Sequence, residues 1–235
     1  MEAAEILFFI TWLGQSCFLI EAKDVRILID PFGGKVGYPV QPVKADIVTV
    51  SHEHFDHNNV EMAEGSPVVL RGLTKGGADW AKIDYQGKGV KIRTVNVYHD
   101  DKQGAQRGKD AIFIYEIGGL QVVHTGDLGH PLTDEQVKQI GPVDILMLCV
   151  GGFYTIGPDE AKTAAKLLKP RILIPMHFKT EDTPNLPIGG VDAFLEGWDK
   201  VVREKDARFG VPKDLSGFPR GQTTVVVLPF LGEGK

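Results

Sequence analysis

One stretch joins an apolar run to a cluster of titratable side chains: Ile47-Val48-Thr49-Val50-Ser51-His52-Glu53-His54-Phe55-Asp56-His57. The run at its start is apolar or β-branched, which predicts a buried strand. The residues that follow have the pattern His-x-His-x-Asp-His, and imidazole nitrogen and carboxylate oxygen are ligands that zinc prefers. We therefore expect a metal site on the loop that leaves the carboxyl end of this strand.

The spacing of this motif divides its ligands between two ions. His52 and His54 occupy alternate positions of an extended segment, so their side chains point the same way and can hold one ion. Asp56 and His57 follow after the chain turns and can reach a second ion beside it. Two other interpretations are a chance pattern and a histidine cluster without metal, but titratable groups this close repel unless something offsets their charge.

Bulk composition predicts one soluble globular domain over residues 1–235. Hydrophobic residues make up 43% and charged residues 24% of the chain, both ordinary values. The formal net charge is -5 and no basic run occurs, which argues against a nucleic-acid partner. The run Ile6–Leu13 is too short to span a membrane and is preceded by acidic residues, so we expect no signal peptide and no membrane partner.

The two cysteines, Cys17 and Cys149, lie inside apolar strand-like runs. We interpret them as small buried hydrophobic residues and not as a disulfide or as metal ligands. This favours a reducing, cytoplasmic compartment.

Apolar and alternating runs predict strands along most of the chain. They cover Ile6–Leu13, Cys17–Glu21, Val25–Asp30, Ile47–Ser51, Val68–Arg71, Lys91–His99, Ala111–Ile117, Leu120–His124, Ile145–Val150, Arg171–Met176 and Thr223–Leu228. Helical patterns cover His57–Glu64, part of Leu73–Ala81, Thr133–Ile140, Pro158 to about Leu168, and Val191–Lys205 with Trp198 in the core.

Three further ligand candidates stand at or just after strand ends. His99 supplies the third ligand that a site built from His52 and His54 lacks, since three histidines form a known catalytic zinc site. Asp127 can bridge two cations with its two oxygens. His177 ends another buried strand.

Five other polar residues near these ends have less certain roles. Asp30 is either a turn residue or a carboxylate that orients a ligand histidine. We expect Asp100 and Asp101 to be solvated loop residues rather than ligands. His124 and His130 are more typical of ligand-orienting or surface residues than of ligands.

Two residues of later loops have two interpretations each. Tyr154 is either a core or rim residue or a donor to an oxyanion. Lys179 is either solvated or a contact for an anionic substrate. The loops near Gly33–Lys44, Asp100–Lys109 and Thr180–Gly190 are expected to line a pocket, and they carry no motif that names a substrate.

The order of these candidates resembles the five motifs of the metallo-β-lactamase superfamily: Asp30, His52-x-His54-x-Asp56-His57, His99, Asp127 and His177. The resemblance runs from about Ile6 to His177. Within the superfamily the chain is similar to small, single-domain metal-dependent hydrolases related to ascorbate-6-phosphate lactonase, chiefly over Asp144–His177.

This resemblance implies an α/β (α+β) fold, a four-layer αββα sandwich of two mixed β-sheets flanked by helices. It implies two divalent ions, zinc first and manganese or iron as alternatives. It places His52, His54 and His99 on one ion and Asp56, His57 and His177 on the other, with Asp127 bridging them. It also assigns Asp30 an orienting role.

Some features depart from that family or from parts of it. Asn58-Asn59 follows the histidine motif, where many of the hydrolases have Ile-Gly-Gly or Ala-Gly-Gly. The long inserted domain of the RNA-processing branch is missing from the sequence, as is the flavodoxin-like extension of the diiron oxygen reductases.

The implied function is a binuclear metal-dependent hydrolase with a small-molecule substrate: an ester, lactone or phosphoester. Two dications about 3.5–4 Å apart hold a hydroxide between them and lower the pKa of its parent water. Asp56 aims that hydroxide as the catalytic carboxylate. The alternatives are a phosphodiesterase or nuclease of the same superfamily and a non-catalytic metal-binding protein; a homo-oligomer is left open.

Overall fold

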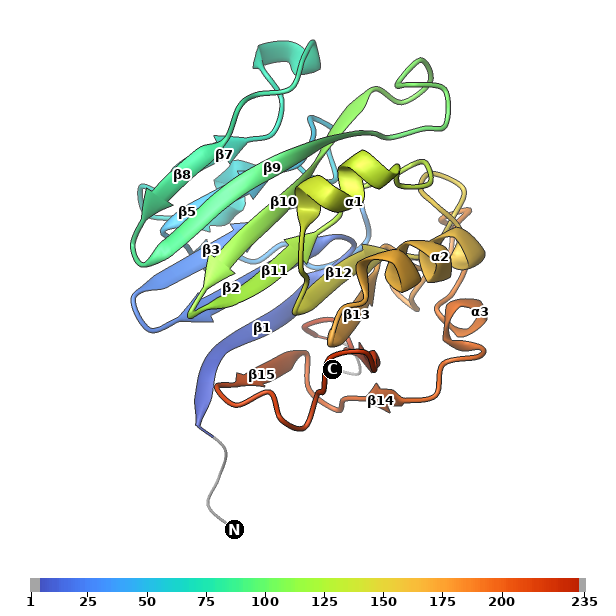
Figure 1. Ribbon diagram of the computed structural model, residues 1–235. Helices are drawn as coiled ribbons and strands as arrows, with labels where there is room; N and C mark the ends of the chain where they lie inside the picture. Colours follow the sequence, from blue (N-terminus) through green and yellow to red (C-terminus); the bar gives the residue numbers. More distant parts are fainter. Residues whose placement is uncertain (1–4, 233–235) are drawn as a thin grey trace.

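Two large mixed β-sheets face each other across the core (Figure 1). The computed structural model describes residues 5–232, so the ends of the expected 1–235 domain lie outside the described residues. The six-stranded sheet has the order β15-β1-β2-β3-β5-β7. Its strands are β1 Ile6–Gly14, β2 Cys17–Ala22, β3 Val25–Ile29, β5 Ile47–Val50, β7 Val68–Arg71 and β15 Arg208–Pro212.

The second sheet is eight-stranded, in the order β14-β16-β13-β12-β11-β10-β9-β8. Its strands are β8 Asp84–Gly87, β9 Val90–Tyr98, β10 Lys109–Ile117, β11 Leu120–His124, β12 Ile145–Cys149, β13 Ile172–Met176, β14 Val201–Arg203 and β16 Thr224–Val227. A short parallel pair joins β4 Val43–Lys44 to β6 Ala63–Glu64.

Strand direction brings the polar strand ends together. β11, β12 and β13 pair in parallel, and β9 and β11 both run antiparallel to β10, which lies between them. The carboxyl ends of β9, β11 and β13 therefore meet at one edge of the eight-stranded sheet. β5, parallel to β3 and β7, ends close to them from the opposite sheet.

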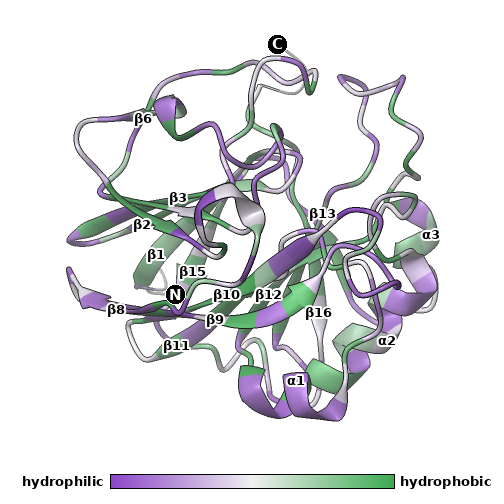
Figure 2. Cartoon of the chain, turned by 90° about the horizontal axis from the view of Figure 1, so that it is seen from above, coloured by the Kyte–Doolittle hydropathy of each residue, from purple (hydrophilic) through white to green (hydrophobic). Residues whose placement is uncertain are grey.

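The core fills the space between the sheets. β12 and β13 are buried at every residue, in agreement with their continuous apolar sequences. Figure 2 shows largely green strands in the middle of the molecule, whereas much of helix α1 is purple. Cys17 and Cys149 are free and buried, and burial raises the pKa of both thiols.

The helices are short and pack mainly against the eight-stranded sheet (Figure 1). They are the 3-10 helices η1 Val60–Met62 and η2 Lys75–Gly77 and the α-helices α1 Asp134–Ile140, α2 Pro158–Leu168 and α3 Asp192–Leu195. The expected cap of α1 is present, because Thr133 Oγ1 accepts from Gln136 N and Gln136 Oε1 accepts from Thr133 N. The architecture has the two mixed sheets of the predicted sandwich with thin helical layers.

Two predicted helices are wrong. Over Val191–Lys205 the structure has only the short α3 and then β14, because Gly197 takes a left-handed conformation (φ 82°) and the following residues pair with β16. Trp198 is half-buried and packs against Phe194, with ring centroids 5.7 Å apart.

The predicted helix His57–Glu64 is replaced by η1 and β6. Asn58 Nδ2 donates to Glu53 O, and Asn59 Nδ2 donates to Phe32 O, each at 2.9 Å. Such side-chain bonds to the backbone compete with helix formation. The short β4 and β6 and the strands β8, β14 and β15 were not predicted from the sequence; the last three each form an edge of a sheet.

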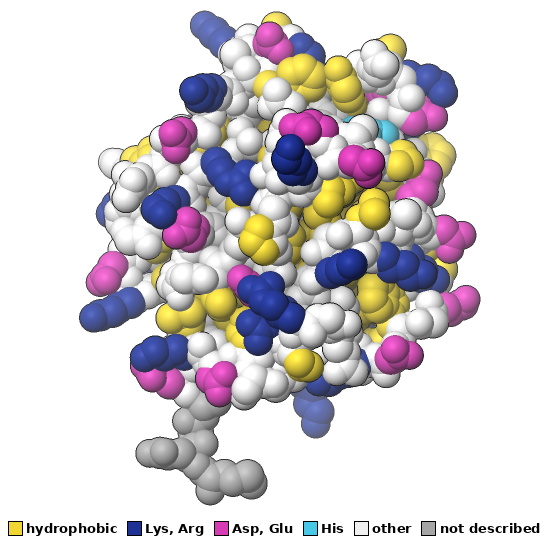
Figure 3. Space-filling model, viewed as in Figure 1, with side chains coloured by type: hydrophobic (Ala, Val, Ile, Leu, Met, Phe, Trp, Pro, Cys, Tyr) yellow, Lys and Arg dark blue, Asp and Glu magenta, His cyan; other side chains and the backbone are white. Residues whose placement is uncertain are grey.

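No helix among residues 5–232 is long and apolar enough to cross a membrane. Basic and acidic side chains are interspersed over the face drawn in Figure 3, without a broad area of one sign.

A buried hydrogen bond joins a strand of one sheet to a strand of the other inside the core. Thr49 Oγ1 on β5 lies 2.7 Å from Tyr115 Oη on β10, and both side chains are buried. We expect Thr49→Val and Tyr115→Phe each to lower the free energy of unfolding by about 1–3 kcal/mol, since each strands one buried hydroxyl. The double variant should lose less than the sum, because it strands neither. Urea unfolding of the four proteins measures this, and strictly additive losses would contradict it.

Candidate metal centre

Seven predicted ligands converge where these strands end. Their ligand atoms form two groups, each with all atoms within 4.8 Å of one another. The first group contains His52, His54 and His99, and the second contains Asp56, His57, Asp127 and His177. The sequence motif after β5 supplies members of both groups, and the ends of β9, β11 and β13 supply the rest.

The first group consists of three closely packed imidazoles. His52 Nε2 lies 3.0 Å from His54 Nδ1, and the His99 ring centroid lies 4.8 Å from that of His52 and 5.0 Å from that of His54. Burial, together with the neighbouring His52 and His99, lowers the pKa of His54 to about 4. His54 is therefore neutral at physiological pH, which is the form that binds metal.

Asp127 joins the two groups. Its Oδ2 atom lies 3.2 Å from His57 Nε2, 3.3 Å from His177 Nε2 and 3.2 Å from His99 Nε2. Burial alone would raise the pKa of Asp127, but the nearby His177 and His57 hold it well below its usual range. The carboxylate is thus ionised and lies between ligands of both groups.

Asp30 is hydrogen-bonded to His57 of the second ligand group and to Ser51. Its Oδ2 accepts from His57 Nδ1 at 2.9 Å and from Ser51 Oγ at 2.6 Å, and its Oδ1 accepts from Ser51 N at 2.7 Å. Asp30 directly follows the end of β3, and its backbone has a positive φ angle of 44°. Its contact with His57 is the one typical of a carboxylate and a metal-binding histidine, so the contacts favour the orienting interpretation over that of a simple turn residue.

The contact between His57 and Asp127 fits a bound cation. His57 Nδ1 donates to Asp30, so the neutral ring directs the lone pair of Nε2 toward the Asp127 carboxylate. Nε2 is buried and has no hydrogen-bond partner within residues 5–232. Burial lowers the pKa of His57, but Asp127 and Asp56 outweigh it and raise that pKa well above normal. A proton or a metal ion between these atoms removes the repulsion, and the donor set suits a transition metal.

Asp110 is a site residue that the sequence analysis missed. It is fully buried, and its Oδ1 lies 3.3 Å from His52 Nδ1. The predicted strand began at Ala111, one residue later, although a carboxylate at the start of an apolar strand was a usable signal. Asp110 lies beside His52 as Asp30 lies beside His57, but neither of its oxygens makes a hydrogen bond within residues 5–232, whereas Asp30 accepts from His57 Nδ1.

The turn between β1 and β2 also reaches the centre, and no motif predicted it. Gln15 Nε2 donates to Asp56 Oδ2 at 3.1 Å, and Ser16 Oγ donates to Asp127 Oδ1 at 3.3 Å. The carbonyl oxygen of Gln15 accepts from His177 N at 3.1 Å. This turn therefore aligns carboxylate and histidine ligands at once.

His124 and His130 belong to neither ligand group. His124 Nε2 donates to Ser16 O at 2.8 Å, while its Nδ1 accepts from Gly126 N at 3.1 Å. His130 Nε2 accepts from Tyr98 N at 3.1 Å. Both histidines bind backbone next to a predicted ligand, Asp127 or His99, so of the two roles expected for them the contacts favour the orienting one.

Asp100 is not solvated, contrary to expectation. Its exposed fraction is 2%, whereas Asp101 is exposed as expected. Asp100 Oδ1 accepts from the backbone N–H of Lys102 and Gly104, and Oδ2 from those of Gln106 and Arg107, at 2.7–3.0 Å. A carboxylate pairs with four backbone donors at low cost, and in this way it organises the loop that follows His99.

A cavity of about 360 Å³ opens onto the centre. Five predicted ligands line it: His54, Asp56, His99, Asp127 and His177. The three loops expected to line a pocket contribute to it, and Tyr154 forms part of its wall. The size is that of a small-molecule site.

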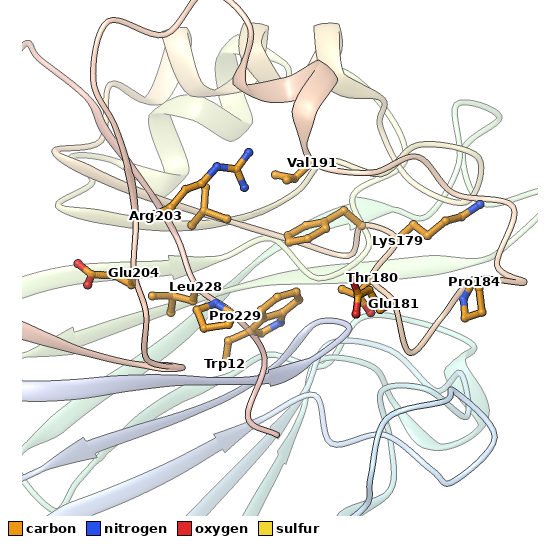
Figure 4. A pocket seen from close by; sticks show the side chains of 12 residues that line it. Trp12, Lys179, Thr180, Glu181, Pro184, Val191, Arg203, Glu204, Leu228 and Pro229 are labelled. Carbon is orange, nitrogen blue, oxygen red and sulfur yellow. The ribbon is translucent and has the colours of Figure 1, made fainter. Parts of the chain in front are cut away.

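A second pocket of about 550 Å³ lies apart from the ligands (Figure 4). Trp12, Phe178 and Lys179 are among its lining residues, and none of the seven predicted ligands is. Lys179 is therefore placed outside the cavity that holds the metal ligands. We take the smaller cavity as the candidate active site because the reactive side chains lie there.

Comparison with known proteins identifies the family. Residues 9–177 match the family model described as Beta-lactamase superfamily domain, so the chain belongs to the beta-lactamase superfamily. The facing mixed sheets and the relatives described next define it as a metal-dependent hydrolase with the metallo-β-lactamase fold.

The relatives carry matching descriptions. An Archaeoglobus fulgidus protein named UPF0173 metal-dependent hydrolase is 34% identical over 193 residues, 73% of this chain and 83% of that protein. A Thermoplasma volcanium protein with the same family name is 34% identical, over 74% of this chain and 84% of that one. A crystal structure from Thermotoga maritima, described as a Zn-dependent hydrolase of the metallo-beta-lactamase superfamily, is 36% identical with a TM-score of 0.74, covering 95% of this chain and 100% of that one. The relation to ascorbate-6-phosphate lactonase stays a prediction.

The Asp100 carboxylate provides a test of the loop beside this centre. Asp100→Asn should lower the free energy of unfolding at pH 7 by about 2 kcal/mol or more, because the amide nitrogen faces backbone donors that it cannot bind. Burial alone would raise the pKa of Asp100, but its four N–H partners lower it overall. The carboxylate's stabilisation is therefore present above the unfolded pKa of about 4 and lost as pH falls through the folded pKa.

The measurement is urea unfolding of chelated protein at pH 7 and at pH 3, with Asp101→Asn as the matched control. The difference between wild type and Asp100→Asn should shrink at pH 3, and the control should change little at either pH. An equally stable Asp100→Asn at pH 7 would show that the loop does not depend on this carboxylate.

Proposed function

We propose that the chain is a binuclear hydrolase that cleaves a small ester, lactone or phosphoester. Its two divalent ions are zinc, with manganese or iron as alternatives. The observation that supports this best is the position of Asp127 Oδ2, within 3.3 Å of histidines from both ligand groups. A carboxylate oxygen shared in this way is what two adjacent cations require of a bridging ligand.

The ions would supply hydroxide at neutral pH by lowering the pKa of a water held between them, and would polarise the acceptor oxygen of the substrate. Asp30 accepts from His57 Nδ1, and Asp110 lies 3.3 Å from His52 Nδ1, so in both rings the opposite nitrogen, Nε2, is the one that would bind an ion. The cavity wall orients the substrate against this centre.

Asp56 is proposed as the catalytic carboxylate. Burial raises its pKa, but His57 and other histidines lower it overall, so the side chain is ionised and can accept a proton. Gln15 donates to Oδ2 and holds the group in place, while Oδ1 makes no hydrogen bond to residues 5–232. Asp56 lines the cavity and its side chain is 18% exposed, so Oδ1 can take the proton of the attacking water and later pass it to the leaving oxygen.

The first test is the number of ions. Metal-loaded wild type should hold two transition-metal ions per chain by elemental analysis. Asp127→Ala should lower occupancy at both sites, His99→Ala mainly at the first and His177→Ala mainly at the second, as read by anomalous scattering. Asp101→Ala, a change at an exposed side chain that belongs to neither ligand group, is the control and should keep both ions. Saturation at one ion, or two unshifted ions in Asp127→Ala, would contradict the binuclear arrangement.

The second test separates catalysis from metal binding. Asp56→Asn keeps the size and one acceptor oxygen of the side chain but loses its charge and basicity. At matched metal occupancy we expect its turnover to fall about a hundredfold or more, the range of a general acid–base group. The assay is hydrolysis of esters, lactones and phosphodiesters across pH. Equal turnover at equal occupancy would assign Asp56 to metal binding alone, and no turnover of any of these substrates by wild type would overturn the proposed reaction.

A further inference from the structure

Resting on the hydrolase function proposed above, we propose that the substrate is an organic anion and that Arg107 binds its anionic group. The group is a carboxylate or a phosphate, carried on an apolar segment away from the bond that is cleaved. Arg107 is thereby a substrate-binding residue that sets specificity.

The lining of the 360 Å³ cavity has three kinds of side chain. Beside the ligands, it contains the apolar or aromatic residues Val36, Phe55, Tyr154 and Leu186. It also contains two cations, Lys35 and Arg107, and its carboxylates are both predicted metal ligands. With those carboxylates directed at the ions, the cations have no negative partner in the cavity and favour an anionic ligand.

Arg107 is held in position while its charge stays unpaired. Its backbone N–H donates to Asp100 Oδ2 at 2.7 Å, and its Nη2 donates to Phe153 O at 3.1 Å. The guanidinium carbon lies 5.7 Å from the centroid of the Tyr154 ring. No carboxylate forms an ion pair with Arg107 in the described part of the chain, residues 5–232. A guanidinium has five N–H donors in a fixed fork, so most of them remain for a planar carboxylate or a phosphate.

The loop that carries Arg107 is anchored to the metal centre at both ends. Asp100 directly follows the ligand His99, and His99 N donates to Gly108 O at 3.0 Å. The four bonds to Asp100 fill the inside of this loop. The distance between the guanidinium and the reactive centre is therefore set by the fold, which limits the entropy lost on binding.

Phe55 is the side chain that favours an apolar segment in the substrate. This side chain belongs to the metal motif, lines the cavity and is 60% exposed. An apolar part of the ligand that covers it removes hydrophobic surface from water. Lys35 is exposed in a different loop and is a weaker candidate than the braced Arg107.

The test compares two esters of the same length, mono-4-nitrophenyl adipate and 4-nitrophenyl hexanoate, with metal-loaded protein. Wild type should show a kcat/KM at least about tenfold higher for the adipate ester, as expected for one charge-assisted pair. In Arg107→Gln this ratio should fall to about one, through KM of the adipate ester, and Arg107→Lys should restore part of it. Lys102→Gln, a change at an exposed lysine of the same loop, should keep the wild-type ratio.

A binding measurement separates this inference from the proposed reaction. Calorimetry with the corresponding anilides, adipic acid monoanilide and hexanoic anilide, should show the same preference and the same loss in Arg107→Gln. Binding preference without turnover of either ester would count against the hydrolase and leave the Arg107 assignment standing. Turnover of both esters with equal kcat/KM, or a ratio unchanged in Arg107→Gln, would overturn the Arg107 assignment and leave the hydrolase standing.

Discussion

A buried carboxylate surrounded by imidazoles is the feature on which the centre depends. Asp127 is almost inaccessible to solvent, and three histidine Nε2 atoms lie 3.2–3.3 Å from one of its oxygens. A charge in such a place is costly unless it is paired. The three histidines offset it; Asp30 accepts from His57, and Asp110 lies 3.3 Å from the neighbouring His52. Near the strand ends, Asp127 therefore lies on one side of the histidines, and the carboxylates of Asp30 and Asp110 lie on the other side.

The backbone has little freedom around this arrangement. A Cβ atom on Gly129 would lie 2.2 Å from the backbone carbon of His99, and one on Gly126 would lie 2.6 Å from both Asp110 carboxylate oxygens. Asp30, Gln15 and His177 have positive φ angles although none of them is glycine. Such conformations persist only where surrounding contacts impose them, and they gather at functional sites. Here the constrained backbone is that of the predicted ligands and of the residues that support them. The loop that bears Arg107, by contrast, forms part of the cavity wall.

The sequence predicted which titratable side chains converge better than it predicted the residues that support them. Buried strands with continuous apolar residues, such as β12 and β13, were clear, and so were the histidines that follow strand ends. The helix expected over Val191–Lys205 was wrong, since the same apolar spacing suits a short helix followed by an edge strand. Asp100 was expected to be a solvated loop residue, because the residue pattern does not show that four backbone N–H groups donate to its carboxylate.

By itself the sequence determined which residue types stand at the ends of which strands, because a dense motif and strand periodicity are local properties. It therefore sufficed for the family, for the two-sheet architecture and for the seven candidate ligands. Only the tertiary structure decided that Asp110 faces His52, that Gln15 reaches Asp56 and that Arg107 lies in the cavity wall. These contacts join residues as many as 58 positions apart or lie across a folded loop. Their partners are selected by sheet order and loop packing, which no single segment encodes.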